Sequence, residues 1–161
     1  MLIREEDPAD TAAVRAIVQK AFGRPDEARL VERLRADGDT VLAAVAVSNE
    51  IIVGYVMLSK MMAPFRAVGL APVAVLPKCQ RRGIATQLIR WALQWVEQHG
   101  WEGVFVLGDP SFYRRFGFDP ETAAGFETPY AGPHFMALAF GPALPASGGR
   151  IEYAGAFAEL S

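Results

Sequence analysis

The chain has 161 residues, 52% apolar side chains and a net charge of −2, which favours one globular domain over residues 1–161 and gives no general attraction to nucleic acid. No apolar run reaches the length of a membrane span, and the acidic N-terminus lacks the apolar core of a signal peptide, so a cytoplasmic protein is expected. One cysteine excludes an internal disulfide, and two histidines that lie far apart offer no metal-binding constellation.

The first sixty residues predict a strand, two helices and a hairpin. Asp7 or Asp10 offers an N-cap for the first helix, and Gly23 stands where that helix should end. Two β-rich apolar runs flank a polar turn and therefore predict an antiparallel hairpin, with a bulge at Gly54. The predicted elements are a strand at 2–4, helices at 11–22 and 25–36, and strands at 40–47 and 51–60.

The central stretch, residues 70–100, predicts a buried strand, a basic turn and a helix. The strand is the apolar run at 73–76, and Pro77 ends it because proline cannot donate a hydrogen bond to a sheet. From Ile84 to His99 apolar residues recur at helical spacing, and Gly100 stands where a left-handed C-cap is expected.

The remaining residues complete a mixed α/β chain. They predict a strand at 103–107, a short helix at 111–116, a surface loop at 119–132 and strands at 135–140 and 150–153. The whole order combines hairpins with two crossover connections. It therefore predicts an α/β fold whose sheet is mixed, as in α+β proteins.

The basic turn before the central helix is expected to bind an anion. The first amides of a helix have no intrahelical partner, and the helix dipole favours negative charge there. Gly83 lets a ligand approach the backbone, and Lys78, Arg81 and Arg82 add positive charge. A phosphate or pyrophosphate held by main-chain N–H groups is therefore expected. The turn matches neither the Walker pattern nor G-x-G-x-x-G.

The same turn carries a resemblance to a known family. The run Gln80-Arg81-Arg82-Gly83-Ile84-Ala85 resembles motif A of the GNAT family of N-acetyltransferases, Q/R-x-x-G-x-G/A. The order of elements resembles that family's acyl-CoA N-acyltransferase fold over nearly the whole chain, a central mixed sheet flanked by helices on both faces.

The resemblance implies acetyl-CoA as co-substrate and no metal. It implies that Val73, Ala74 and Val75 lie along the pantetheine arm, where an amide near Val75 could polarise the thioester carbonyl. The residues implied at the pyrophosphate are Gln80, Arg81, Arg82, Gly83, Ile84 and Ala85, and Thr86 is implied to bind the same cofactor.

A second motif lies downstream. Phe112-Tyr113-Arg114-Arg115-Phe116-Gly117-Phe118 resembles the family's motif B, in which a tyrosine protonates the leaving thiolate. By this resemblance Tyr113 is the catalytic acid; the alternative is a packed aromatic residue. Many members carry Asn-x-x-Ala-x-x-x-Tyr before this point, but here Val106 and Asp109 occupy those positions. The chain therefore resembles a subgroup with a short Gly-Asp-Pro lead into the helix, which Asp109 is expected to cap.

The function implied is transfer of an acetyl group from acetyl-CoA to a primary amine by direct attack, without an acyl-enzyme. Glu127, Asp109 and His134 are candidate general bases by composition only, and a water chain would serve equally well. Cys79 precedes the phosphate turn rather than the expected thioester position, which disfavours a nucleophilic role.

The expected partner is a small-molecule or protein amine acceptor, with no nucleic acid and no membrane. Its identity and the oligomeric state stay open, a homodimer included. One alternative is a non-catalytic acyl-CoA-binding or sensor module of the same fold. A phosphate-loop nucleotide-binding protein is a further alternative, disfavoured because no Lys-Ser/Thr pair follows Gly83.

Overall fold

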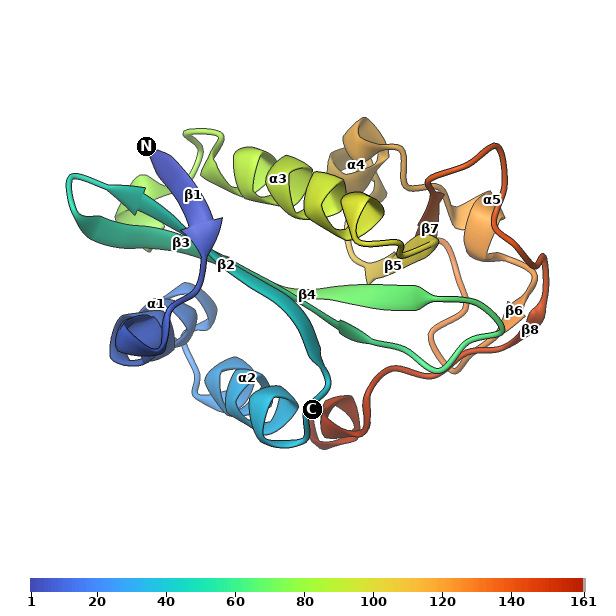
Figure 1. The fold of residues 1–161 in the computed structure, drawn as a ribbon, viewed down its shortest axis with the longest axis horizontal. Coiled ribbons are helices and arrows are strands. Elements are labelled where there is room, and N and C mark those ends of the chain that lie inside the picture. The colour runs from blue at the N-terminus through green and yellow to red at the C-terminus, as the bar shows by residue number, and fades with distance from the viewer. Residues whose placement is uncertain (161) are drawn as a thin grey trace.

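The computed structural model describes residues 1–160, and its central feature is a six-stranded sheet in the order β1-β2-β3-β4-β5-β7 (Figure 1). Only β4 and β5 run parallel, and the other neighbours are antiparallel, so the sheet is mixed as predicted. The strands are β1 (Leu2–Glu5), β2 (Thr40–Ser48), β3 (Ile51–Lys60), β4 (Ala67–Val75), β5 (Gly103–Leu107) and β7 (Phe135–Ala139).

Helices cover both faces of this sheet. A 3₁₀ turn at Pro8–Asp10 leads into α1 (Thr11–Phe22), which lies with α2 (Asp26–Ala36) on one face, and α3 (Ile84–Gln98) lies with α4 (Pro110–Tyr113) on the other (Figure 1). Gly23 and Gly100 follow α1 and α3 with φ of 70° and 84°, the left-handed conformation expected after a helix. No helix among residues 1–160 is both long enough and apolar enough to span a bilayer.

Gly54 marks the place where α3 packs closely on the sheet. The predicted hairpin of β2 and β3 is confirmed, and its register shifts between Ala46 and Val47, beside Gly54. A Cβ built on Gly54 would lie 2.8 Å from Cδ1 of Leu88 and 2.9 Å from Cγ2 of Ile84. The missing side chain therefore lets the helix approach the strand.

The segment 119–132 was expected to be a loop, and this expectation is wrong. It contains α5 (Pro120–Ala123) and β6 (Phe126–Glu127). Asp119 caps α5 by accepting a hydrogen bond from the amide of Glu121 at 2.8 Å. The Asp-Pro start of α5 repeats the Asp-Pro start of α4, so the local signal for a helix was present in the sequence.

The final strand also differs from the prediction. The expected strand at 150–153 is replaced by β8 (Gly149–Arg150), which pairs in parallel with β6 in a separate two-stranded sheet. Residues after β8 then run across the face that α1 and α2 cover (Figure 1). Met62 and Glu152 exchange backbone hydrogen bonds of 2.8 and 2.9 Å there. Two-residue strands carry too few side chains for an alternating pattern, which explains the error.

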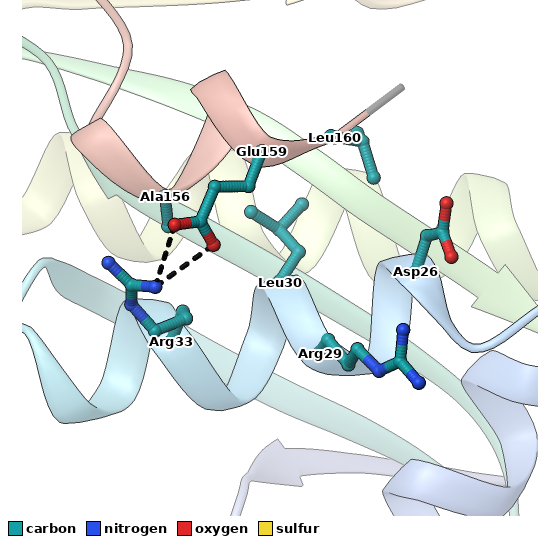
Figure 2. Close-up of a pocket in the computed structure, with 7 residues that line it drawn as sticks. All are labelled: Asp26, Arg29, Leu30, Arg33, Ala156, Glu159 and Leu160. Atoms are coloured by element: carbon teal, nitrogen blue, oxygen red, sulfur yellow. Dashed lines mark hydrogen bonds and ion pairs between the residues drawn. The ribbon is translucent and has the colours of Figure 1, made fainter.

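The chain ends in a 3₁₀ helix, Gly155–Glu159, that lies beside α2. Both carboxylate oxygens of Glu159 lie 2.9 Å from Nη1 of Arg33, and Leu30 is buried behind this pair (Figure 2). A hollow of about 260 Å³ separates the two elements. Both elements lie on the face of the sheet opposite α3 (Figure 1).

Candidate active site

The parallel strands β4 and β5 separate after a short contact. They pair only from Ala67 to Gly69 on β4 and from Gly103 to Phe105 on β5. Residues 70–75 continue β4 with β3 as their neighbour on one side and an open edge on the other.

The open edge of β4 presents the backbone of Val73 and Val75. The amide of Leu76 donates to the carbonyl of Val53 on β3 at 2.9 Å, so Leu76 faces β3. Successive residues of a strand direct their backbone groups to opposite edges. Val75 therefore faces away from β3, and its carbonyl accepts a hydrogen bond from Nε2 of Gln80 at 3.2 Å. Val73 faces the same way, whereas the backbone of Ala74 points toward β3.

The turn between β4 and α3 leaves the helix N-terminus open. Arg81 and Gly83 both have positive φ, 64° and 80°, and no side chain of residues 1–160 caps the first amides of α3. None of the described atoms beyond its chain neighbours lies within 4 Å of a Cβ built on Gly83. Amides without partners at an accessible helix N-terminus, beside a basic side chain, form an anion-binding arrangement.

A hollow of about 460 Å³ lies between this turn and the region of α4. It is lined by Val73, Val75, Cys79, Gln80, Arg81, Gly83, Ile84, Ala85, Thr86, Phe112 and Arg115. All of the predicted binding residues line it except Ala74 and Arg82. Ala74 is buried in the core, and Arg82 is exposed beside the turn.

Sequence analysis missed Phe112 and Arg115 in this hollow. The guanidinium carbon of Arg115 lies 5.2 Å from the centroid of the Phe112 ring, so each side chain positions the other. Their spacing of three residues on a helical segment placed them on one side, and this was the available signal.

Tyr113 lies at the end of α4 with its ring against the chain that follows β5. A Cβ on Gly108 would come within 2.5 Å of Cε2 of Tyr113, so the glycine makes room for the ring. Phe112 and Phe118 pack against it with centroid separations of 5.0 and 5.8 Å. Burial raises the pKa of Tyr113.

The hydroxyl of Tyr113 neither donates nor accepts a hydrogen bond within residues 1–160. Across those residues, Ser59 Oγ is the one fully buried side-chain oxygen or nitrogen without a partner. The Tyr113 oxygen therefore reaches open space, where it can donate to a ligand.

The three candidate bases occupy different places. Asp109 caps α4, as predicted, and accepts from the amide and the hydroxyl of Ser111 at 3.0 and 2.9 Å. These hydrogen bonds lower the pKa of Asp109. His134 is exposed on the connection before β7, and Glu127 lies in a separate groove. No group of three or more His, Cys, Asp or Glu side chains within residues 1–160 is arranged to hold a metal ion.

The separate groove, called here the C-terminal groove, has a volume of about 510 Å³ and lies between the β6–β8 pair and the last 3₁₀ helix. It is lined by Glu127, Thr128, Pro129, Tyr130, Arg150, Ile151, Glu152, Tyr153, Ala154, Gly155, Phe157 and Ala158. Sequence analysis missed Tyr153, which the fold brings against Gly69, the last residue of β4 that pairs with β5.

Comparison with known proteins agrees with this geometry. The model of the acetyltransferase (GNAT) family matches residues 11–118, which include the whole β4–turn–α3 unit and Tyr113. The chain belongs to the GNAT acetyltransferase family. The uncharacterized N-acetyltransferase YhbS of Escherichia coli strain K12 is 39% identical over 123 residues, which are 74% of each chain. YjhQ of the same strain is 32% identical over 136 residues, 79% of this chain and 75% of YjhQ.

Solved structures of GNAT proteins superpose on nearly the whole chain. The crystal structure of E. coli YhbS in complex with CoA has a TM-score of 0.92 and 33% identity, covering 99% of this chain and 93% of YhbS. A GNAT acetyltransferase from Brucella melitensis in complex with acetyl-CoA has a TM-score of 0.83 and 34% identity, covering 97% of both chains. The predicted fold, a central mixed sheet with helices on both faces, is therefore confirmed.

Proposed function

We propose that this protein is an acetyl-CoA-dependent N-acetyltransferase that moves an acetyl group to a primary amine by direct attack. The observation that carries the proposal is the open edge of β4, which is joined to the uncapped N-terminus of α3 by the 3₁₀ turn at Pro77–Cys79 and the turn at Gly83. Relatives of about one-third identity that contain CoA or acetyl-CoA support the choice of ligand.

The residues of this chain fit acetyl-CoA in three ways. The backbone of Val73 and Val75 on the open edge suits an extended chain of amides such as the pantetheine arm. The amides after Gly83 suit a pyrophosphate. Arg81 lines the hollow and adds charge at close range, whereas Arg82 adds charge only from outside it.

The chemistry assigned to Tyr113 is proton donation. Acetyl-CoA supplies an activated thioester, so the neutral amine nitrogen bonds to the acyl carbon while the C–S bond breaks and its electron pair stays on sulfur. Tyr113 donates its proton to that sulfur, the amine nitrogen loses a proton to water, and water returns a proton to the Tyr113 phenolate. Burial of Tyr113 keeps it protonated at neutral pH, as an acid must be before it acts. Cys79 lies beside the proposed pyrophosphate site, so no acyl-enzyme is assigned.

The short Gly108-Asp109-Pro110 lead into α4 is proposed to mark a subgroup of the family. Here the carboxylate four residues before Tyr113 is held in a helix cap and not directed at a substrate. This observation favours the second candidate function, a non-catalytic acyl-CoA-binding sensor of the same fold.

Two measurements test the proposal. CoA and acetyl-CoA should raise the melting temperature in a dose-dependent way, and ATP and NAD should do much less, because only a native-state ligand stabilises the fold. Release of CoA thiol from acetyl-CoA should then require a primary amine from a broad panel. Equal stabilisation by ATP would favour a nucleotide-binding protein. Tight CoA binding without thiol release for any amine would favour the sensor.

A further inference from the structure

Tyr153 joins the C-terminal groove to the point on β4 where the gap between β4 and β5 begins. The ring of Tyr153 occupies the space beside Gly69, where the pairing of β4 with β5 ends. Burial raises the pKa of Tyr153. The segment that carries Tyr153 follows β8 and crosses the face of the sheet opposite α4 (Figure 1).

We infer that the C-terminal groove is the acceptor site of the proposed acetyl transfer, and that it takes a small primary amine as its ammonium ion. The role of the groove as an acceptor site rests on the proposed function. The chemistry of its ligand follows from the residues that line the groove.

The aromatic lining of the groove suits a cation on an organic body. The rings of Tyr130 and Tyr153 meet edge to face at a centroid separation of 5.4 Å, and Phe157 lies 5.0 Å from Tyr153. Ring faces attract an ammonium group, and the apolar ring surface packs against the carbon skeleton that carries it.

The charge in the groove is also of the required sign. Glu152 forms an ion pair with Arg150 at 2.6 Å. Glu127 has no ion-pair partner within residues 1–160. Because the pair of Arg150 and Glu152 neutralises itself, Glu127 leaves the groove with one negative charge in excess, which favours a monovalent cation.

The size of the groove selects a small molecule. Its volume of about 510 Å³ is typical of small-ligand sites. The hydroxyl of Tyr153 makes no hydrogen bond within residues 1–160, so it is free to orient the ligand as a positioning residue. The overall change balances as ammonium plus acetyl-CoA giving acetamide, CoA thiol and one released proton.

Binding is tested without turnover by an NMR titration of the full chain, saturated with CoA, against benzylamine. We expect saturable shifts at Tyr130, Tyr153 and Ala154. Benzyl alcohol, which has the same shape without the charge, should bind about 10-fold more weakly.

Glu127→Gln should weaken benzylamine binding about 2- to 5-fold, the range for one exposed ion pair. Glu121→Gln is the matched control, since Glu121 is an exposed carboxylate on α5 outside the groove.

Shifts that lie elsewhere, or that are equal for the amine and the alcohol, would overturn the inference. Thiol-release kinetics distinguish a wrong acceptor site from a wrong proposed function. If an amine is acetylated and Glu127→Gln leaves its KM unchanged, the acceptor binds elsewhere and the acetyltransferase stands. If benzylamine binds in the groove but no amine is acetylated, the acetyltransferase is wrong and an ammonium-binding groove remains.

Discussion

The ring of Tyr153 occupies the space that a side chain at Gly69 would need. A Cβ built on Gly69 would lie 2.6 Å from Cε1 and 2.9 Å from Cδ1 of Tyr153. The absence of a side chain at one position of β4 thus admits a residue that lies 84 positions later in the sequence. This contact joins the interior of the sheet, at the last position where β4 pairs with β5, to the C-terminal groove.

Gly69→Ala should therefore displace Tyr153. We expect a loss of about 1–3 kcal/mol in the free energy of unfolding from overpacking. KM for the amine should rise, and KM for acetyl-CoA should stay unchanged. Gly54→Ala is the matched control, because its Cβ would meet Leu88 at a comparable 2.8 Å on the side of α3. If both variants change the amine KM equally, the contact at Gly69 has no particular link to the acceptor.

Gly83 combines a left-handed backbone with open space in front of it. Gly83→Ala should cost about 1–2 kcal/mol from the positive φ alone, and it should weaken CoA binding about 10-fold or more by obstructing the approach to the amides. Gly100→Ala, at the other end of α3, shares the positive φ and the open surroundings.

Calorimetry with CoA and thermal melting together separate the two effects of Gly83→Ala. Both glycine variants should melt about 2–4 °C lower for each kcal/mol that is lost. Only Gly83→Ala should lose CoA affinity. Unchanged CoA binding in a folded Gly83→Ala protein would refute the assignment of the turn.

Two arginine-paired carboxylates at the N-terminal side should respond to pH in opposite ways. Glu6 pairs with Arg35 and accepts from the hydroxyl of Tyr55 at 3.4 Å, but burial outweighs these contacts and raises its pKa. Asp10 accepts from Arg4 at 2.7 and 3.1 Å, and these hydrogen bonds lower its pKa.

The sign follows from proton linkage. A raised carboxyl pKa means that the native state holds the proton longer, so the contribution of Glu6 to stability falls as the pH rises from about 4 through its native pKa. The contribution of Asp10 is present above its unfolded pKa and is lost as the pH falls through its lower native pKa. Urea unfolding between about pH 3 and 7 gives the free energy of unfolding of wild type, Glu6→Gln and Asp10→Asn. The difference between wild type and each variant, plotted against pH, should have opposite slopes for Glu6→Gln and Asp10→Asn. Slopes of the same sign would contradict this account of burial at Glu6.

The candidate ligand-binding turn could be predicted because its parts are contiguous. A strand, a proline, a basic turn with Gly83 and an amphipathic helix follow one another, so local rules place them without knowledge of the tertiary fold. Asp109 could be predicted as a cap for the same reason. The start of β4 at Ala67 was missed because Gly69 and Pro72 interrupt its apolar pattern, and its pairing with β3 and β5 compensates.

The C-terminal groove could not be predicted in this way. Tyr130 and Tyr153 come together only because two short strands, β6 and β8, pair across a long connection and the chain then crosses beneath the sheet. Neither strand has a periodicity of its own. The position of Tyr153 against Gly69 depends on that crossing, so no local pattern around either residue indicates it.

Tyr113→Phe separates an enzyme from a sensor. The change removes one hydroxyl and keeps the ring packed against Phe112 and Phe118, so acetyl-CoA binding should barely change. If Tyr113 protonates the thiolate, kcat should fall about 10²-fold or more while KM for acetyl-CoA is preserved. Because burial raises the pKa of Tyr113, the alkaline loss of wild-type activity should lie above the ordinary phenol value near 10, and the variant should lack this limb.

Tyr55→Phe is the control for loss of a phenol, since Tyr55 is buried with Glu6 and Arg35 on the face of α1 and α2. It should lower the melting temperature and leave kcat unchanged, as measured by thiol release at saturating acetyl-CoA. A Tyr113→Phe protein that turns over at the wild-type rate would assign the proton to water and leave Tyr113 as a packing residue. If wild type and Tyr113→Phe both bind acetyl-CoA tightly and neither consumes it with any amine, the sensor becomes the better description, because a sensor needs the open β4 edge and the Gly83 turn but no acid.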